Sequence, residues 1–190
     1  LDPRIGKLFL NAGPGYGGSC LPKDMKALIN FAKASGINPT LLNAVEEVNT
    51  KQLEQIILMI KQKLGNLASK KITILGTAFK PNTDDIRDSI AIELIKKLLN
   101  KKAKIIIHDP KAMKNTQRIF KEKINYAKTI EDALAKSQCV IIMTQWKQYE
   151  KLNNNQFKYM TRKFVIDCRR MLAKKQLDVD YYAIGLGKQN

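Results

Sequence analysis

The stretch Ile72-Thr73-Ile74-Leu75-Gly76 decides the fold, because the spacing of apolar residues along the chain changes there. Before it, apolar residues recur at helical spacing from about 22 to 36 and from about 39 to 64. After it, short apolar runs with the length of buried strands alternate with helical stretches. The expected strands are 72–76, 104–108, 139–143, 164–167 and 183–185, and the expected helices lie at about 88–99 and 129–136.

This alternation predicts an α/β fold, in which a helical segment is followed by a doubly wound, mainly parallel, Rossmann-like sheet. Ligands of such sheets bind beyond the carboxyl ends of the strands. Three loops are expected at that edge: 77–87, 144–146 and 168–170. We therefore expect the functional site among these loops.

Composition narrows the class of protein. The 190 residues are 44% hydrophobic, and no apolar run reaches the ~18 residues that a membrane span needs. The three cysteines form a sparse, odd set, which favours a reducing cytoplasm over a disulfide scaffold. Only one histidine is present and no CxxC pair, so we expect no metal site. The chain opens without a Met or a signal peptide, and we expect it to be a piece of a longer one.

The net charge of +17 invites a nucleic-acid interpretation. The excess is mostly Lys, however, and it is scattered along the chain, whereas Arg is the usual base reader. No helix-turn-helix or aromatic stacking platform is recognisable, so we expect no nucleic-acid partner and keep such a binder as a minor alternative. The favoured interpretation is a solvated surface whose field also attracts a polyanionic substrate.

The stretch Gly13-Pro14-Gly15-Tyr16-Gly17-Gly18-Ser19-Cys20-Leu21-Pro22-Lys23-Asp24 is the most informative for chemistry. Its glycines let the backbone approach a ligand closely. Cys20 directly precedes the first expected helix, whose positive end stabilises a thiolate, and Lys23 adds charge. Asp24 lies four residues on and can reach back. A thiolate beside a carboxylate suits covalent catalysis, although a structural cysteine after a Gly-rich turn explains the residue types about as well.

This stretch resembles the catalytic-cysteine motif of the UDP-glucose/GDP-mannose dehydrogenase family. Residues 76–87, Gly-Thr-Ala-Phe-Lys-Pro-Asn-Thr-Asp-Asp-Ile-Arg, resemble the signature of that family's C-terminal domain. Asp167-Cys168-Arg169 resembles its Asp-Gly-Arg, with Cys168 where glycine is usual. The resemblance covers the whole chain and implies that residues 1–68 are part of the central helical dimerisation region. Residues 69–190 would be the nucleotide-sugar-binding domain, with the NAD-binding domain upstream.

The resemblance also implies a mechanism. The family oxidises a sugar's primary alcohol to a carboxylate by two hydride transfers to NAD⁺. Cys20 would add to the intermediate aldehyde as a thiohemiacetal, which hydride loss converts to a thioester that water hydrolyses. Asp24 would position and activate that water. A homodimer through the long helix 39–64 is expected.

The binding residues implied by the resemblance fall into two groups. Those for the sugar nucleotide are Arg4, Phe9, Leu10, Asn11, Tyr16, Gly17, Phe79, Lys80 and Arg169. Those for the cofactor are Lys23 and Arg87. The opening Asp-Pro-Arg-Ile-Gly and the loop 79–85 look most like the bacterial UDP-glucose branch. Oxidation of UDP-N-acetylmannosamine or GDP-mannose remains an alternative, as does a non-catalytic UDP-sugar-binding dimerisation module. Core packing of Phe79 and solvated positions for Lys80 and Arg169 also remain open.

Overall fold

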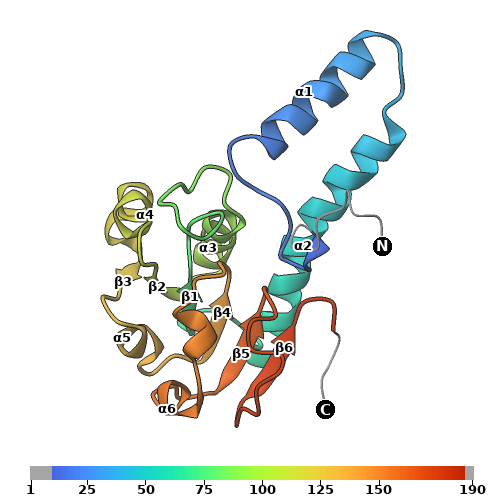
Figure 1. The fold of residues 1–190 in the computed structure, drawn as a ribbon. Helices are drawn as coiled ribbons and strands as arrows, with labels where there is room; N and C mark the ends of the chain where they lie inside the picture. Colours follow the sequence, from blue (N-terminus) through green and yellow to red (C-terminus); the bar gives the residue numbers. More distant parts are fainter. Residues whose placement is uncertain (1–9, 187–190) are drawn as a thin grey trace.

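The computed structural model describes residues 10–186. Two long helices come first, and the strands and helices that follow alternate as expected (Figure 1). In chain order the elements are α1 (Leu21–Ala34), α2 (Thr40–Leu64), β1 (Lys71–Leu75), α3 (Ile90–Asn100), β2 (Lys104–His108), α4 (Met113–Phe120), η2 (Lys121–Lys123), β3 (Asn125–Tyr126), α5 (Ile130–Leu134), β4 (Cys139–Ile142), η3 (Tyr149–Lys151), α6 (Asn154–Phe157), β5 (Phe164–Asp167) and β6 (Asp180–Ala183).

The strands form one six-stranded sheet in the order β3-β2-β1-β4-β5-β6, and every pair is parallel. The chain therefore leaves β1 toward one edge of the sheet and returns to its other side at β4. This arrangement confirms the predicted α/β class and the predicted parallel sheet. It also places the carboxyl ends of β1, β4 and β5 along one edge, as the predicted site requires.

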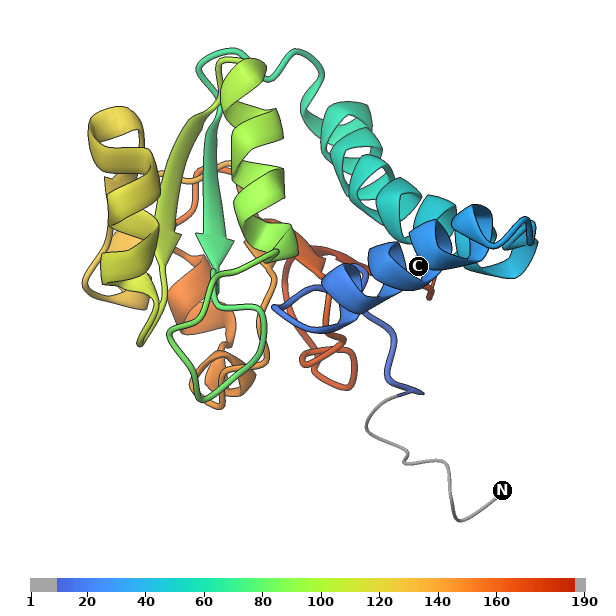
Figure 2. The same ribbon diagram turned by 90° about the horizontal axis from the view of Figure 1, so that it is seen from above.

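Alternation along the strands gives the sheet two buried faces. In β4, Cys139 and Ile141 point to one core, while Val140 and Ile142 point to the other. Helices α2 and α3 cover the first face, and α5, η3 and α6 cover the second. Figure 2 shows α3 lying along the sheet, with α2 beside it. Continuous apolar strands are needed because both faces are covered.

Helix α2 belongs to the sheet at one end only. Its C-terminal half buries Leu53, Ile56 and Ile60 in the first core. Its N-terminal half forms a hairpin with α1 that projects from the α/β body (Figure 1). On this hairpin the side chains of Phe31 and Leu41 are 71% and 75% exposed. Neither α2 nor any other helix within residues 10–186 is long and apolar enough to cross a membrane.

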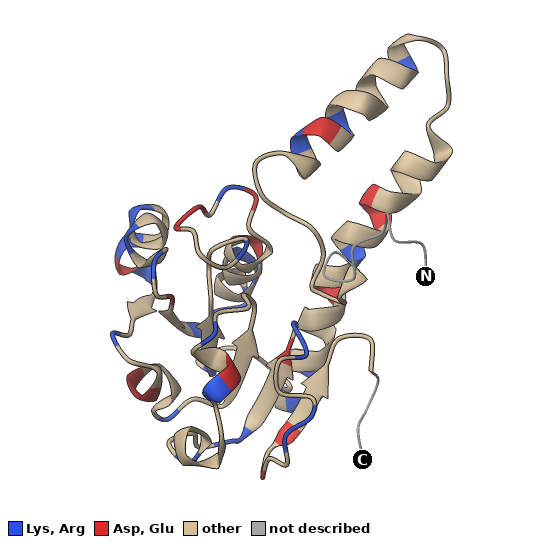
Figure 3. Ribbon diagram, in the orientation of Figure 1, with Lys and Arg blue, Asp and Glu red and all other residues tan. Residues whose placement is uncertain are grey.

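The structure differs from the prediction at the elements whose sequence patterns are weakest. The last strand is Asp180–Ala183, so the prediction of 183–185 was wrong by about three residues. Five elements were not predicted at all: α4, η2, the two-residue β3, η3 and the four-residue α6. Short elements like these carry too few side chains for a periodic signal. Figure 3 shows that Lys and Arg are spread over the hairpin and the α/β body alike.

The end of α3 yields a test of backbone strain. Lys102 takes a left-handed conformation (φ 58°), and the N–H groups of Lys102 and Ala103 bond to Leu99 O and Leu98 O. Glycine is the residue favoured at this position. We expect Lys102→Gly to raise the free energy of unfolding by about 0.5–1 kcal/mol. Lys101→Gly is the matched control: at φ −92°, glycine only adds flexibility and should destabilise by a similar amount. Urea denaturation measures both, and shifts of the same sign would contradict the account.

Candidate active site at the carboxyl edge of the sheet

The loops that follow β1, β4 and β5 meet at the carboxyl edge of the sheet. The strand order reverses between β1 and β4, and that is where α/β sheets bind ligands. A narrow cleft lies here, with Phe79, Thr144 and Arg169 among its lining residues. The opposite side of the cleft includes Pro14 and Gly17 of the Gly-rich loop. The structure therefore brings the two halves of the predicted site together.

Close packing explains the glycines in that loop. A Cβ on Gly18, whose φ is +89°, would lie 2.6 Å from the Phe79 ring. A Cβ on Gly17 would collide with the backbone oxygen of Asp88. The loop thus runs directly over the Phe79 loop and the approach to α3, with no room for side chains between them.

Cys20 is the N-cap of the 14-residue helix α1 and is exposed. Its Sγ lies 3.7 Å from the Ser19 hydroxyl, and its carbonyl accepts a bond from the N–H of Asp24 at 2.9 Å. The predicted position of Cys20 at a helix N-terminus is therefore confirmed. The Asp24 carboxylate lies one turn further on and pairs with Lys23 at 3.2 Å.

The other two cysteines are unsuited to chemistry. Cys139 and Cys168 are fully buried, and burial raises the pKa of both thiols well above the usual range. Cys168 stands where the family has glycine, yet its backbone is not left-handed and its N–H donates to Ile142 O at 3.0 Å. Its side chain fills the first core. A cysteine at this position therefore fits the core without a strained backbone.

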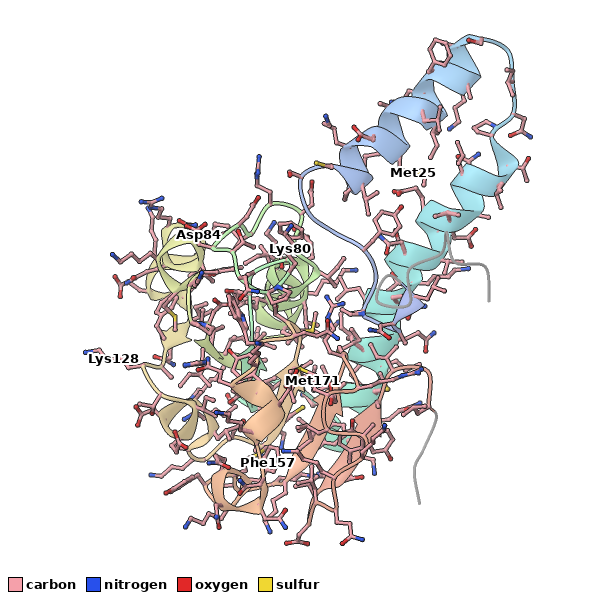
Figure 4. The ribbon with its side chains drawn as sticks, in the orientation of Figure 1. Met25, Lys80, Asp84, Lys128, Phe157 and Met171 are labelled. Carbon is pink, nitrogen blue, oxygen red and sulfur yellow. The ribbon has the colours of Figure 1, made fainter. Side chains whose placement is uncertain are left out.

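Two cations flank the cleft from different loops. Lys80 is exposed, with its Nζ 5.3 Å from the centre of the half-buried Phe79 ring. Figure 4 shows Lys80 and Asp84 on the loop after β1, toward the edge opposite Phe157. Arg169 is half-buried, and its Nε donates to Met143 O at 2.8 Å. Burial lowers the pKa of Arg169, but a guanidinium remains charged at neutral pH. Both cations suit an anionic ligand.

Arg87 forms an ion pair with Asp85. Its Nε lies 3.0 Å from Oδ1 and its Nη2 lies 2.6 Å from Oδ2. This pair lowers the pKa of the Asp85 carboxyl and raises that of Arg87, and negative charge on Cys20 raises the pKa of Arg87 further. Arg87 adjoins Asp88, whose backbone oxygen packs against Gly17, three residues before Cys20.

Some predicted residues fall outside the described part of the chain, and others do not line this cleft. Arg4 and Phe9 fall outside the described residues, while Leu10 and Asn11 are exposed. Gly17 lines the cleft, but Tyr16 turns to α2, where its hydroxyl donates to Glu46. Burial, together with the Glu46 carboxylate, raises the pKa of Tyr16 to about 12.

Asp109, which the sequence did not single out, holds the start of the loop that carries Phe79. Its buried carboxylate follows β2 and accepts five hydrogen bonds. The donors are Thr77 N (2.7 Å), Ala78 N (3.1 Å), Trp146 Nε1 (3.2 Å), Lys111 N (2.9 Å) and Ala112 N (2.7 Å). The carboxylate thereby ties the base of the Phe79 loop to β2, to α4 and to the loop after β4. Its place between a buried strand and Pro110 was the available signal.

Two hydroxyl groups complete the support of that loop. Ser89 Oγ donates to Thr77 O at 2.7 Å, and Thr144 Oγ1 donates to Ala78 O at 2.6 Å. Both hydroxyls are buried. The backbone just before Phe79 is therefore held on the donor and the acceptor side alike.

Removing the Asp109 carboxylate should be costly. We expect Asp109→Ala to lower the free energy of unfolding by about 3–5 kcal/mol, because buried donors lose an ionised partner. Glu150→Ala, which removes an exposed carboxylate, should change it by less than about 0.5 kcal/mol. Guanidinium denaturation followed by circular dichroism compares the two. Equal effects would show that Asp109 does not support the loop.

Comparison with known proteins agrees with this geometry. Residues 1–51 match the UDP-glucose/GDP-mannose dehydrogenase family, central domain, and residues 73–174 match its UDP binding domain. Over 184 residues the chain is 41% identical to UDP-glucose 6-dehydrogenase AglM of Haloferax volcanii, covering 97% of this chain and 42% of that protein. A UDP-glucose 6-dehydrogenase of Rickettsia felis is 37% identical over 191 residues, with 97% and 43% covered.

A solved structure shows the same arrangement. The UDP-glucose dehydrogenase of Pyrobaculum islandicum superposes with a TM-score of 0.85 at 35% identity, covering 95% of this chain and 40% of that one. The chain thus spans about two fifths of the length of these relatives. On these matches, the chain belongs to the UDP-glucose/GDP-mannose dehydrogenase family and carries sequence of its central and UDP-binding domains.

Proposed function

We propose that this chain supplies the catalytic cysteine and the nucleotide-sugar site of an NAD-dependent enzyme that oxidises UDP-glucose to UDP-glucuronate. The observation that carries the proposal is the position of Cys20. Cys20, whose thiol is exposed, occupies the N-cap position of α1 at the end of a loop that also lines the cleft with Phe79 and Arg169. A nucleotide bound over the loops that line this cleft would have its sugar on the side of the Gly-rich loop, which leads to the thiol.

The cleft residues suit a uridine diphosphate. Arg169 offers a half-buried fork and Lys80 an exposed ammonium, which together match a diphosphate. Phe79 adds an apolar surface. We also propose that Lys23 and Arg87, which are exposed cations near Cys20, hold the cofactor, because its pyrophosphate is anionic.

The chemistry assigned to Cys20 is needed for the second oxidation. An aldehyde carries no hydride to give up until its carbon becomes tetrahedral. The Cys20 thiolate adds to that carbon, a C–S bond forms and the carbonyl oxygen takes up a proton. Loss of a hydride and of the hydroxyl proton gives a thioester, and water then releases the carboxylate and restores the thiol. Two NAD⁺ molecules, bound one after the other, would each accept one hydride. Asp24, one helical turn from Cys20, is proposed to position the water.

The choice of sugar follows the relatives. The proteins at 35–41% identity are named for UDP-glucose. Solved structures named for UDP-N-acetylmannosamine or GDP-mannose are 20–24% identical, so they support the fold alone. The alternative from another class is a module that binds UDP-sugars and dimerises without oxidising them. The exposed apolar side chains of the hairpin formed by α1 and α2 support dimerisation in both cases. Three free cysteines favour a reducing, cytoplasmic setting.

Calorimetric titration with UDP tests the binding half of the proposal. We expect Lys80→Ala and Arg169→Ala each to weaken binding by about ten- to a hundredfold, because each removes a charge-assisted contact with phosphate. Lys128→Ala is the matched control, since Lys128 projects from the loop after β3 (Figure 4). Unchanged affinity in both cleft variants would place the nucleotide elsewhere.

Turnover in the longer protein that contains this chain tests the catalytic half. With UDP-glucose and NAD⁺, Cys20→Ser should reduce NADH formation on the order of 10³-fold or more, since serine is a poor nucleophile without a base. Ser19→Ala, one residue away, should stay within a few-fold of the wild type. Near-normal turnover of Cys20→Ser would refute the mechanism. A wild type that binds UDP yet forms no NADH would favour the non-catalytic module.

A further inference from the structure

The backbone of the Gly-rich loop is held by α2 through one side chain. Tyr16 N donates to Asn49 Oδ1 at 2.8 Å, and Asn49 Nδ2 donates to Tyr16 O at 3.1 Å. An amide is the side-chain group that can satisfy an N–H and a C=O together, as a neighbouring strand would. One turn earlier on α2, Glu46 accepts the Tyr16 hydroxyl. Tyr16 is therefore held at three points from one helix.

We call the contacts of Asn49 and Glu46 with Tyr16 the clamp. The Gly-rich loop leaves room for it. Gly15 has a φ of +114°, and a Cβ there would lie 2.5 Å from Asn49 Oδ1. Only a glycine leaves room for the amide to reach the Tyr16 backbone. Asn49 itself is half-buried, although it lies on the part of α2 that leaves the sheet.

The clamp stands on a rigid support. Leu53 and Ile56 follow Asn49 by one and two turns and are buried in the sheet core. Beyond Tyr16, only Gly17, Gly18 and Ser19 separate the clamp from Cys20. Two glycines in three residues give this segment high conformational freedom when it is not held.

We propose that Asn49, assisted by Glu46, is a positioning residue that fixes Cys20 for catalysis. The inference rests on the proposed function, because it takes Cys20 as the nucleophile. Asn49 does not line the cleft with Phe79 and Arg169: it acts through the backbone of Tyr16 and sets where the short segment to Cys20 begins. The packing of α2 on the sheet, together with the packing of Gly17 and Gly18 on Asp88 and Phe79, thereby determines where the thiol stands relative to the cleft.

The test compares Asn49→Leu, which keeps the size and loses both bonds, with Gln55→Leu on the exposed side of α2. The time profile of Cys20 alkylation by iodoacetamide is measured at neutral pH; Cys139 and Cys168 are buried and should not react. In Asn49→Leu the segment that leads to Cys20 is no longer held from α2. We expect the alkylation rate to change by about threefold or more, because the surroundings of the thiol are no longer fixed. Gln55→Leu should match the wild type.

A second readout uses turnover in the longer protein that contains this chain. Asn49→Leu should lower kcat tenfold or more, while the KM for UDP-glucose and the calorimetric affinity for UDP stay within about twofold. Asn49→Asp keeps the acceptor and should restore part of the loss. The aspartate variant also serves if the leucine variant does not fold. Partial rescue with unchanged affinity for UDP separates positioning from a general loss of structure.

The outcomes distinguish this inference from the proposed function. An unchanged alkylation profile and unchanged kcat in a folded Asn49 variant would overturn the positioning role and leave the dehydrogenase proposal intact. A shifted profile in a protein that never oxidises UDP-glucose would support the clamp and reject the dehydrogenase. Loss of kcat together with an equal loss of UDP affinity would also overturn the inference, because Asn49 would then be shaping the cleft.

Discussion

The buried carboxylate of Asp109 is the interaction on which the site depends. It sits at the carboxyl end of β2 and gathers five donors from the loop after β1, the start of α4 and Trp146. Buried N–H groups must be paired, and an ionised acceptor pairs them more strongly than a neutral one. The loop that presents Phe79 and Lys80 is therefore rigid at its base before any ligand arrives. Ser89 and Thr144 hold the carbonyl groups of the same short segment.

The candidate site needs a second support that the sheet does not provide. Cys20 lies at the start of α1 on the projecting hairpin, away from the strands (Figure 1). The Gly-rich loop bridges the two parts, with Gly18 against the Phe79 ring and Tyr16 against α2. The C-terminal half of α2 is buried in the core, so α2 connects the hairpin to the sheet. In the proposed function, chemistry and nucleotide binding would therefore belong to different elements that share one loop.

The elements with strong local sequence patterns were predicted well. The strands 104–108 and 164–167 appear at the predicted residues, because an apolar run bounded by polar residues allows few alternatives. The long helix 39–64 differs by one residue at its start. Weak patterns failed: β6 was misplaced, and α4, η2, β3, η3 and α6 were missed. The Tyr16 hydroxyl donates to Glu46, thirty residues away, and nothing in the local sequence reports such a partner.

By itself, then, the sequence determined the α/β class, the parallel sheet, the carboxyl-edge loops and the place of Cys20 at the start of a helix. Each of these follows from local periodicity or from a motif of adjacent residues. The tertiary structure alone decided what supports them: Asp109 beneath the Phe79 loop, Asn49 against Tyr16, and Cys168 filling the core where a glycine is usual. The physical reason is that a hydrogen bond or a packing contact between residues far apart in the sequence depends on how the chain folds. The local sequence around each residue does not specify which distant residue will lie beside it.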